Sequence, residues 1–186
     1  MIGSIGLQAR PPHARILIAS RAVAVWAEDV LRRHGWSTVA SDRPSLVLFD
    51  AAPVPELERI PLAGAVLVAD AAPGALRPHD DAALARLAAE WDSAALIAPA
   101  LRLAAIFGEE PIARALLGLR EQLAAACAGA DVAHRIAGAA GTLGFAAASA
   151  AWMAVADGDA AALPHARHQA RLAILAINCA VSDQQK

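Results

Sequence analysis

Over residues 14–100, short apolar runs alternate with segments whose apolar residues recur at helical spacing. The runs typical of buried strands are Ile16–Ile18, Leu46–Phe49, Ala65–Ala69 and Ala94–Ile97, and Trp36–Ala40 could form another strand. Helical spacing is found at 21–34, which ends before Gly35, and at 80–91, where Asp80 and Asp81 supply acids to the first turn. This alternation predicts a small, mostly parallel α/β sheet.

The pattern changes at both ends of this region. Residues 1–13, which contain Pro11 and Pro12, are expected to form a flexible tail. From Leu101 onward only helical spacing occurs, in four segments: one begins at Glu109, one carries His134 and ends at Gly144, one runs from Phe145 to Val155, and one from Pro164 to Ala180. Because the connections are short, we expect an antiparallel four-helix bundle over residues 101–182.

One histidine in the predicted bundle has unusually small neighbours. Ala137, Gly138 and Gly141 follow His134 by three, four and seven positions, so helical spacing places them beside it. Glycine inside a helix costs about 1 kcal/mol relative to alanine. Two such glycines beside an imidazole suggest that something approaches this face closely, although a close contact with another helix would also explain Gly138.

The segment that starts at His134 resembles the signature of histidine phosphotransfer (HPt) domains. The family pattern is His-x-hydrophobic-Lys-Gly-small-small-x-x-hydrophobic-Gly, and seven positions fit: His134, Ile136, Gly138, Ala139, Ala140, Leu143 and Gly144. Ala137 departs from it, because the family has a lysine there, near the transferred phosphoryl group. The resemblance covers about the last 80 residues. It implies that His134 relays a phosphoryl group between receiver-domain aspartates in a multistep two-component phosphorelay.

The order of elements in residues 14–100 resembles a degenerate receiver domain. Asp50 follows the third predicted strand, where receivers carry the phosphoacceptor aspartate. The receiver's acidic pair is replaced by Ser20 and Arg21, and its Lys-Pro pair by Ala98 and Pro99. Without the acidic pair, Mg²⁺ has no site. We therefore interpret Asp50 as a strand-end carboxylate.

Imidazole suits a reversible phosphoryl carrier because its neutral nitrogen is nucleophilic near pH 7. Such a carrier needs only an exposed nucleophile and a flat rim for docking, since a receiver partner can supply metal, lysine and acids. We expect His134 to be the catalytic residue and Arg135, Ala137, Gly138 and Gly141 to form the surface that meets phosphate and partner. Arg135 could reach the phosphate or could simply be solvated.

Composition excludes several other functions. The only lysine is Lys186, so no lysine can serve a phosphate-binding loop, and we expect no kinase activity of the chain's own. The net charge is −2 without a basic stripe, which argues against nucleic acid as a partner. No apolar run is long enough for a membrane span, and we expect a cytoplasmic location. Cys127 and Cys179 are interpreted as buried free thiols.

No cofactor or metal is expected. His165 and His168 could share a helix face, but no third ligand lies near them in the sequence. The expected partners are receiver domains of response regulators or hybrid histidine kinases. One alternative is a docking or regulatory module that binds receivers or kinases without carrying phosphate. Another is a structural role in which alanine-rich helices form a homodimer. An ordinary metabolic enzyme is not expected, because no nucleophile–base arrangement is found.

Overall fold

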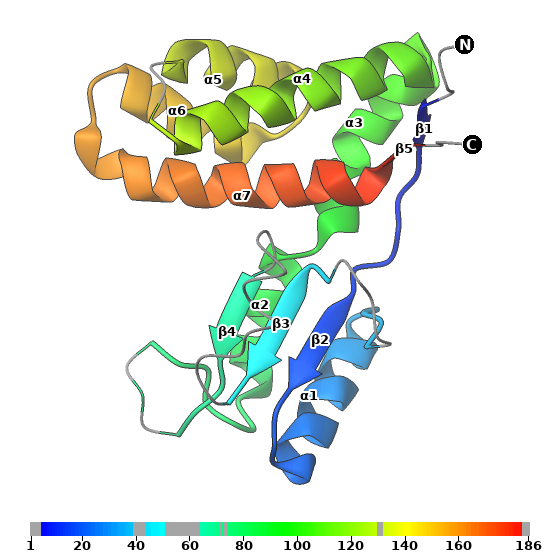
Figure 1. Ribbon diagram of the computed structural model, residues 1–186, viewed down its shortest axis with the longest axis vertical. Coiled ribbons are helices and arrows are strands. Elements are labelled where there is room, and N and C mark those ends of the chain that lie inside the picture. Colours follow the sequence, from blue (N-terminus) through cyan, green and yellow to red (C-terminus); the bar gives the residue numbers. More distant parts are fainter. Residues whose placement is uncertain are drawn as a thin grey trace. The chain divides into compact units, whose positions relative to one another are not determined.

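The computed structural model describes residues 5–38, 44–50, 64–70, 72, 74–129 and 132–183. Its contacts divide the chain into two compact units, Pro11–Asp92 and a second made of Met1–Arg10 together with Ser93–Lys186. The first contains a parallel sheet with helices, and the second is mainly helical (Figure 1). The predicted mixed α/β region followed by helices is therefore present.

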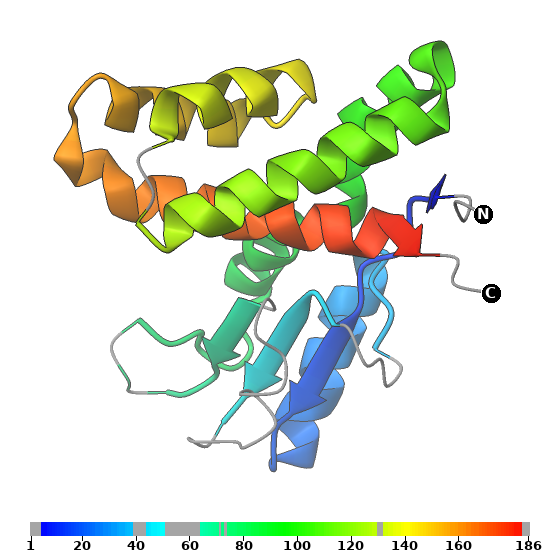
Figure 2. The same ribbon diagram turned by 45° about the horizontal axis from the view of Figure 1, so that its top comes forward.

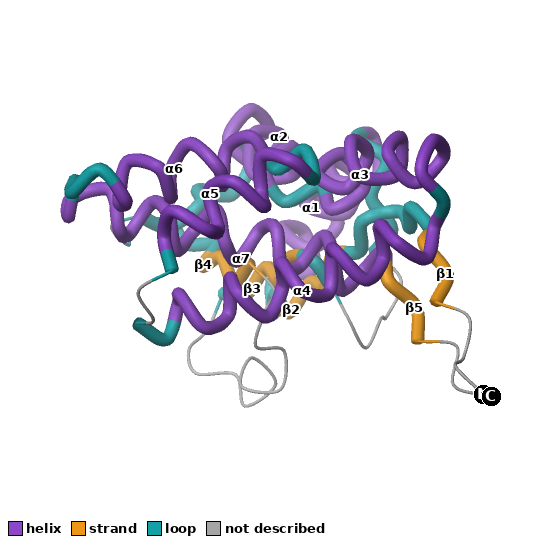
Figure 3. Tube along the Cα trace, turned by 90° about the horizontal axis from the view of Figure 1, so that it is seen from above, coloured by secondary structure: helices purple, strands orange, loops and turns teal. Residues whose placement is uncertain are grey.

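The first unit is built on three parallel strands, in the order β2 (Ala14–Leu17), β3 (Leu46–Phe49) and β4 (Gly64–Leu67). The strands predicted at these places are confirmed. Strand β3 lies in the middle, and its first three residues are fully buried, which explains its unbroken apolar sequence. Helices α1 (Arg21–Arg33) and α2 (Asp81–Glu90) lie on the same side of these strands (Figure 3).

One carboxylate links α1 to α2. Asp81, the first residue of α2, accepts a hydrogen bond from Trp26 Nε1 at 2.7 Å and another from Arg33 Nη2 at 2.9 Å. These two bonds hold the pKa of the Asp81 carboxyl below its usual value. The preceding Asp80 caps α2, because its side chain accepts from the Ala83 N–H at 2.9 Å. The two acids expected in the first turn thus act as a cap and as a link.

Two of the predicted strands are different in the structure. In Trp36–Ala40, Ser37 forms a single parallel bridge with His13, and residues 39 and 40 lie outside the described residues. The strand predicted at Ala94–Ile97 is wrong, because those residues belong to helix α3 (Ser93–Phe107). The apolar run continues past Pro99, which sits inside the helix, and a short apolar run does not distinguish a strand from a buried helix. The contact boundary accordingly falls at 92–93 rather than at the predicted 100–101.

The helices of the second unit pack around α7 (Leu163–Ala180). The others are α3, α4 (Glu109–Cys127), α5 (Ala133–Thr142) and α6 (Ala146–Ala156), with a short 3₁₀ turn at Ala160–Ala162. Helix α7 packs against α3, α4 and α6, whereas α5 packs mainly on α6 and also contacts α4 (Figure 2). Because α7 has neighbours on several sides, every residue from 172 to 177 is buried. Each helix expected after residue 108 is found, and α3 is an addition.

The N-terminal segment is not the expected free tail throughout. Ile5–Leu7 forms strand β1, which pairs antiparallel with β5 (Val181–Asp183). The pairing continues at Gln8, whose N–H donates to the Ala180 carbonyl at 3.0 Å. Strand β1 also contacts α4. The prediction of a flexible tail is therefore wrong for these residues, because the backbone donors and acceptors of β1 find partners at the other end of the sequence.

Candidate functional site

The histidine helix α5 is short and has a well-defined end. It stops at Thr142, and Gly144 then adopts φ +88°, a left-handed conformation that alanine and larger residues avoid. The Phe145 N–H donates to the Ala140 carbonyl at 2.9 Å across this turn. A side chain on Gly144 would also overlap with Pro99 of α3. Both the backbone conformation and the packing therefore require glycine at this position.

The outer side of α5 carries most of the predicted site residues. His134, Arg135, Gly138 and Gly141 are all exposed. Ala137 is not, since its exposed fraction is 0%. The prediction that Ala137 belongs to the docking surface is therefore wrong, because this position faces the interior of the unit.

A serine on α6 holds the helix at the buried position. Ser149 Oγ donates to the Ala137 carbonyl at 2.7 Å, so α6 covers the side of α5 on which Ala137 lies. Farther along α5, Thr142 Oγ1 donates to the Gly138 carbonyl at 2.9 Å. Sequence reasoning missed Ser149, because a single serine in an alanine-rich helix carries no signal of a partner twelve residues earlier.

The glycines beside His134 have different structural reasons. A Cβ atom on Gly141 would lie 2.9 Å from Ser149 Oγ, so the close approach of α5 and α6 explains this glycine. A Cβ on Gly138 would meet no atom within 4 Å. The small size of Gly138 therefore has no packing reason among the described residues, and it leaves the exposed surface next to His134 bare.

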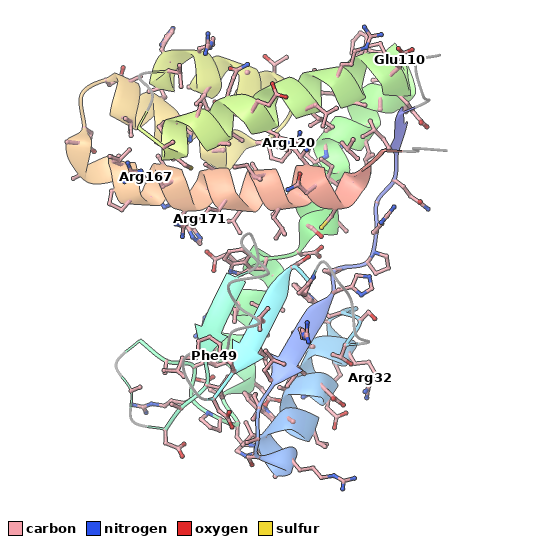
Figure 4. The ribbon with its side chains drawn as sticks, in the orientation of Figure 1. Arg32, Phe49, Glu110, Arg120, Arg167 and Arg171 are labelled. Carbon is pink, nitrogen blue, oxygen red and sulfur yellow. The ribbon has the colours of Figure 1, made fainter. Side chains whose placement is uncertain are left out.

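Charge is sparse on these two helices. Between residues 132 and 156, His134 and Arg135 are the only residues that can carry a charge. Helix α4, which precedes α5 in the chain, has two arginines, and both have partners: Arg114 pairs with Glu110 at 2.7 Å, and Arg120 Nη1 donates to Asn178 Oδ1 at 3.3 Å. Figure 4 shows Arg120 between α4 and α7. Within α5 and α6, the exposed imidazole of His134 therefore has a single other ionisable side chain, that of Arg135.

The end of the parallel sheet is arranged differently from a phosphoacceptor site. Asp50 Oδ2 accepts a hydrogen bond from the Ala19 N–H at 2.7 Å, which joins the segments that follow β3 and β2. Ser20 and Arg21 are exposed there and add no carboxylate. Ala98 and Pro99 lie in α3 and not at a strand end, so their comparison with the receiver's Lys-Pro pair is wrong. Asp50 has the structural role expected of a strand-end carboxylate.

The remaining candidates form no second site. In the part of the chain that the structure describes, no group of three His, Cys, Asp or Glu residues could hold a metal ion. Burial raises the pKa of the Cys127 thiol, although Arg171 and Arg167 of α7 oppose this shift (Figure 4). Neither Cys127 nor Cys179 forms a disulfide. Among the described residues, every helix is too short or too polar to cross a bilayer.

One pocket of the second unit is small and mainly apolar. A pocket of about 150 Å³ lies between α3, α6 and α7, and Gln169 is the only long polar side chain in its lining. Pro99 and Gly144 also line it.

Comparison with known proteins identifies no relative of this chain: no family model, curated protein or solved structure matches it.

Proposed function

We propose that this chain is a histidine phosphotransfer protein of a multistep two-component phosphorelay. In this proposal His134 accepts a phosphoryl group from a receiver aspartate and passes it to another. The observation that carries the proposal is the exposure of His134 at the start of a segment that fits the HPt signature at seven positions. The partners are receiver domains of response regulators or hybrid histidine kinases, in the cytoplasm.

The proposed reaction needs little from this chain beyond a nucleophile. The unprotonated ring nitrogen of His134 attacks phosphorus, the bond from phosphorus to the aspartyl oxygen breaks, and that oxygen leaves as carboxylate. The reverse step regenerates imidazole and phosphorylates the next aspartate. In-line geometry and charge neutralisation dominate such transfers, and a receiver partner can bring Mg²⁺ and its own lysine. The exposed position of His134 allows a partner to approach along the attack line.

The packing of the helices around α5 favours a rigid backbone under this nucleophile. Helices α4 to α7 are taken as the four-helix bundle of the proposal, since α4 contacts both α5 and α7, and α6 also contacts both. Helix α3 is an additional helix that packs on α4 and α7. The buried residues Ile136 and Ala140 anchor α5, so the backbone that carries His134 is held in place.

Phosphotransfer in vitro tests the proposal. The full chain is incubated with a receiver domain carrying labelled aspartyl phosphate, and the label on this chain is measured over time. We expect labelling of the wild-type protein and of His165→Gln, a matched control at an exposed histidine of α7. His134→Gln should stay unlabelled. Equal labelling of His134→Gln and wild type, or no labelling of either by several receivers, rejects the function.

A docking module without phosphate transfer is the second candidate. It is favoured by the absence of an exposed cation at position 137 and by the structural role of Asp50. In that case His134→Ala should bind a receiver or kinase as tightly as wild type while no transfer is detected.

A homodimer would be detected by light scattering during size-exclusion chromatography. Ile106 and Phe107 are exposed at the end of α3, and substitution of both by Ser should disrupt a dimer that forms there.

A further inference from the structure

The charge on a phosphorylated His134 needs a counter-charge. A phosphoryl group at neutral pH carries between one and two negative charges and three strong acceptor oxygens. On the helix pair α5–α6, Arg135 is the only other residue that can be charged. Its side chain is exposed, and no ion pair or hydrogen bond involves it among the described residues.

Position 137 cannot supply this charge in the present fold. Position 137 lies about 60° from His134 around the helix on one side, and position 138 about 40° on the other. Helix α6 covers the first side, as the bond from Ser149 to the Ala137 carbonyl and the complete burial of Ala137 indicate. A longer side chain at 137 would have to enter the contact between α5 and α6.

The neighbouring helix α4 does not offer a free cation either. Arg114 pairs with Glu110, and Arg120 is half-buried and bonds Asn178 of α7. Arg135, by contrast, follows His134 by about 100° around α5. Both side chains start from the same exposed turn, and the long flexible arm of arginine lets the guanidinium bend toward a group carried on the ring.

We propose that Arg135 binds the phosphoryl group on His134 and supplies the positive charge that the buried Ala137 lacks. This inference rests on the proposed function. The guanidinium donates two N–H bonds to phosphoryl oxygens, a geometry that arginine forms readily. It neutralises charge as the nitrogen–phosphorus bond forms and the aspartyl carboxylate leaves. It also lowers the pKa of the second phosphoryl ionisation, since a nearby positive charge favours the dianion.

The test uses the full chain, phosphorylated at His134 by a phosphorylated receiver and, independently, by potassium phosphoramidate. The variants are Arg135→Gln, Arg135→Lys and the matched control Arg167→Gln, an exposed arginine on α7. We expect transfer to His134 to slow about fivefold in Arg135→Gln, to stay within about twofold in Arg135→Lys, and to be unchanged in the control. Adding Ala137→Lys to Arg135→Gln should not restore the rate.

A phosphorus NMR titration separates binding of the phosphoryl group from a structural effect. The second phosphoryl ionisation should move to higher pH in Arg135→Gln than in wild type or Arg167→Gln. If His134 is labelled, and the transfer rates and phosphorus titrations of Arg135→Gln and Arg167→Gln are identical, the role of Arg135 is overturned and the carrier function stays in place. Rescue of Arg135→Gln by Ala137→Lys likewise overturns it. Absence of label on wild-type His134 from either donor overturns the carrier function and this inference together.

Discussion

Replacement of Gly144 by alanine tests how α5 is terminated. Gly144 has φ +88°, and its missing Cβ would overlap with the Cβ of Pro99, which belongs to α3. The left-handed conformation costs alanine about 1–2 kcal/mol. Overpacking against a rigid ring adds about 1–3 kcal/mol. We therefore expect Gly144→Ala to lower the free energy of unfolding of the second unit by about 2–5 kcal/mol.

Gly158 provides a matched control for the backbone term. It has φ +95°, and a Cβ there would meet nothing within 4 Å, so Gly158→Ala should show the conformational cost alone. Urea unfolding followed by far-UV circular dichroism compares the two variants. The thermal midpoint of Gly144→Ala should fall by roughly 5–15 °C for a chain of this size.

The contact with Pro99 can be removed separately. In a Pro99→Gly background the overlap disappears, so Gly144→Ala should then cost no more than Gly158→Ala does. If Gly144→Ala destabilises the wild-type background no more than Gly158→Ala, the packing of α3 against the α5–α6 turn is refuted. A cost in the Pro99→Gly background as large as in wild type would contradict the same reasoning.

Three further predictions concern other contacts. The Cβ of Gly141→Ala would lie 2.9 Å from Ser149 Oγ, an overlap that costs about 1–3 kcal/mol and is opposed by about 1 kcal/mol of helix propensity, so the variant should be more stable in a Ser149→Ala background than the sum of the two single costs; additive costs in urea unfolding would count against this contact. Because hydrogen bonds from Trp26 and Arg33 lower the pKa of folded Asp81, its contribution to stability is present above the unfolded value of 3.8 and is lost as the pH falls through the folded value. Acid unfolding of wild type should therefore depend more steeply on pH below about 4 than that of Asp81→Asn, and equal slopes would exclude the link. In a Cys179→Ser background, Cys127 should react with iodoacetamide at pH 8 more slowly than a small peptide thiol, because its pKa is raised by burial; an equal or faster rate would be inconsistent with that environment.

The strands and helices that bury a whole segment were the easiest to predict. Leu46–Phe49 is apolar at every position because it is the central strand, and the sequence pattern alone identifies it. Ala94–Ile97 has the same kind of composition but lies in a helix. Nothing local separates the two cases, since the outcome depends on what packs around the segment and on whether the run continues beyond Pro99.

The sequence predicted which residues lie beside His134 on α5, but not which of them are exposed. Helical spacing places Ala137 and Gly138 close to His134, but on opposite flanks. Which flank is covered depends on how α6 packs, and that is decided by Ser149 and by the close approach at Gly141. These two contacts join Ser149 to residues twelve and eight positions earlier, yet the alanine-rich sequence gives no pattern that selects one flank over the other.

Because β1 pairs with β5, the second unit consists of two separate stretches of the chain, residues 1–10 and 93–186. Residues 11–92 are thus an insertion, covalently anchored to their host at both ends rather than hung from a single linker. A fragment that starts at Ser93 therefore lacks strand β1, and expression of the second unit alone requires residues 1–10 joined to residues 93–186.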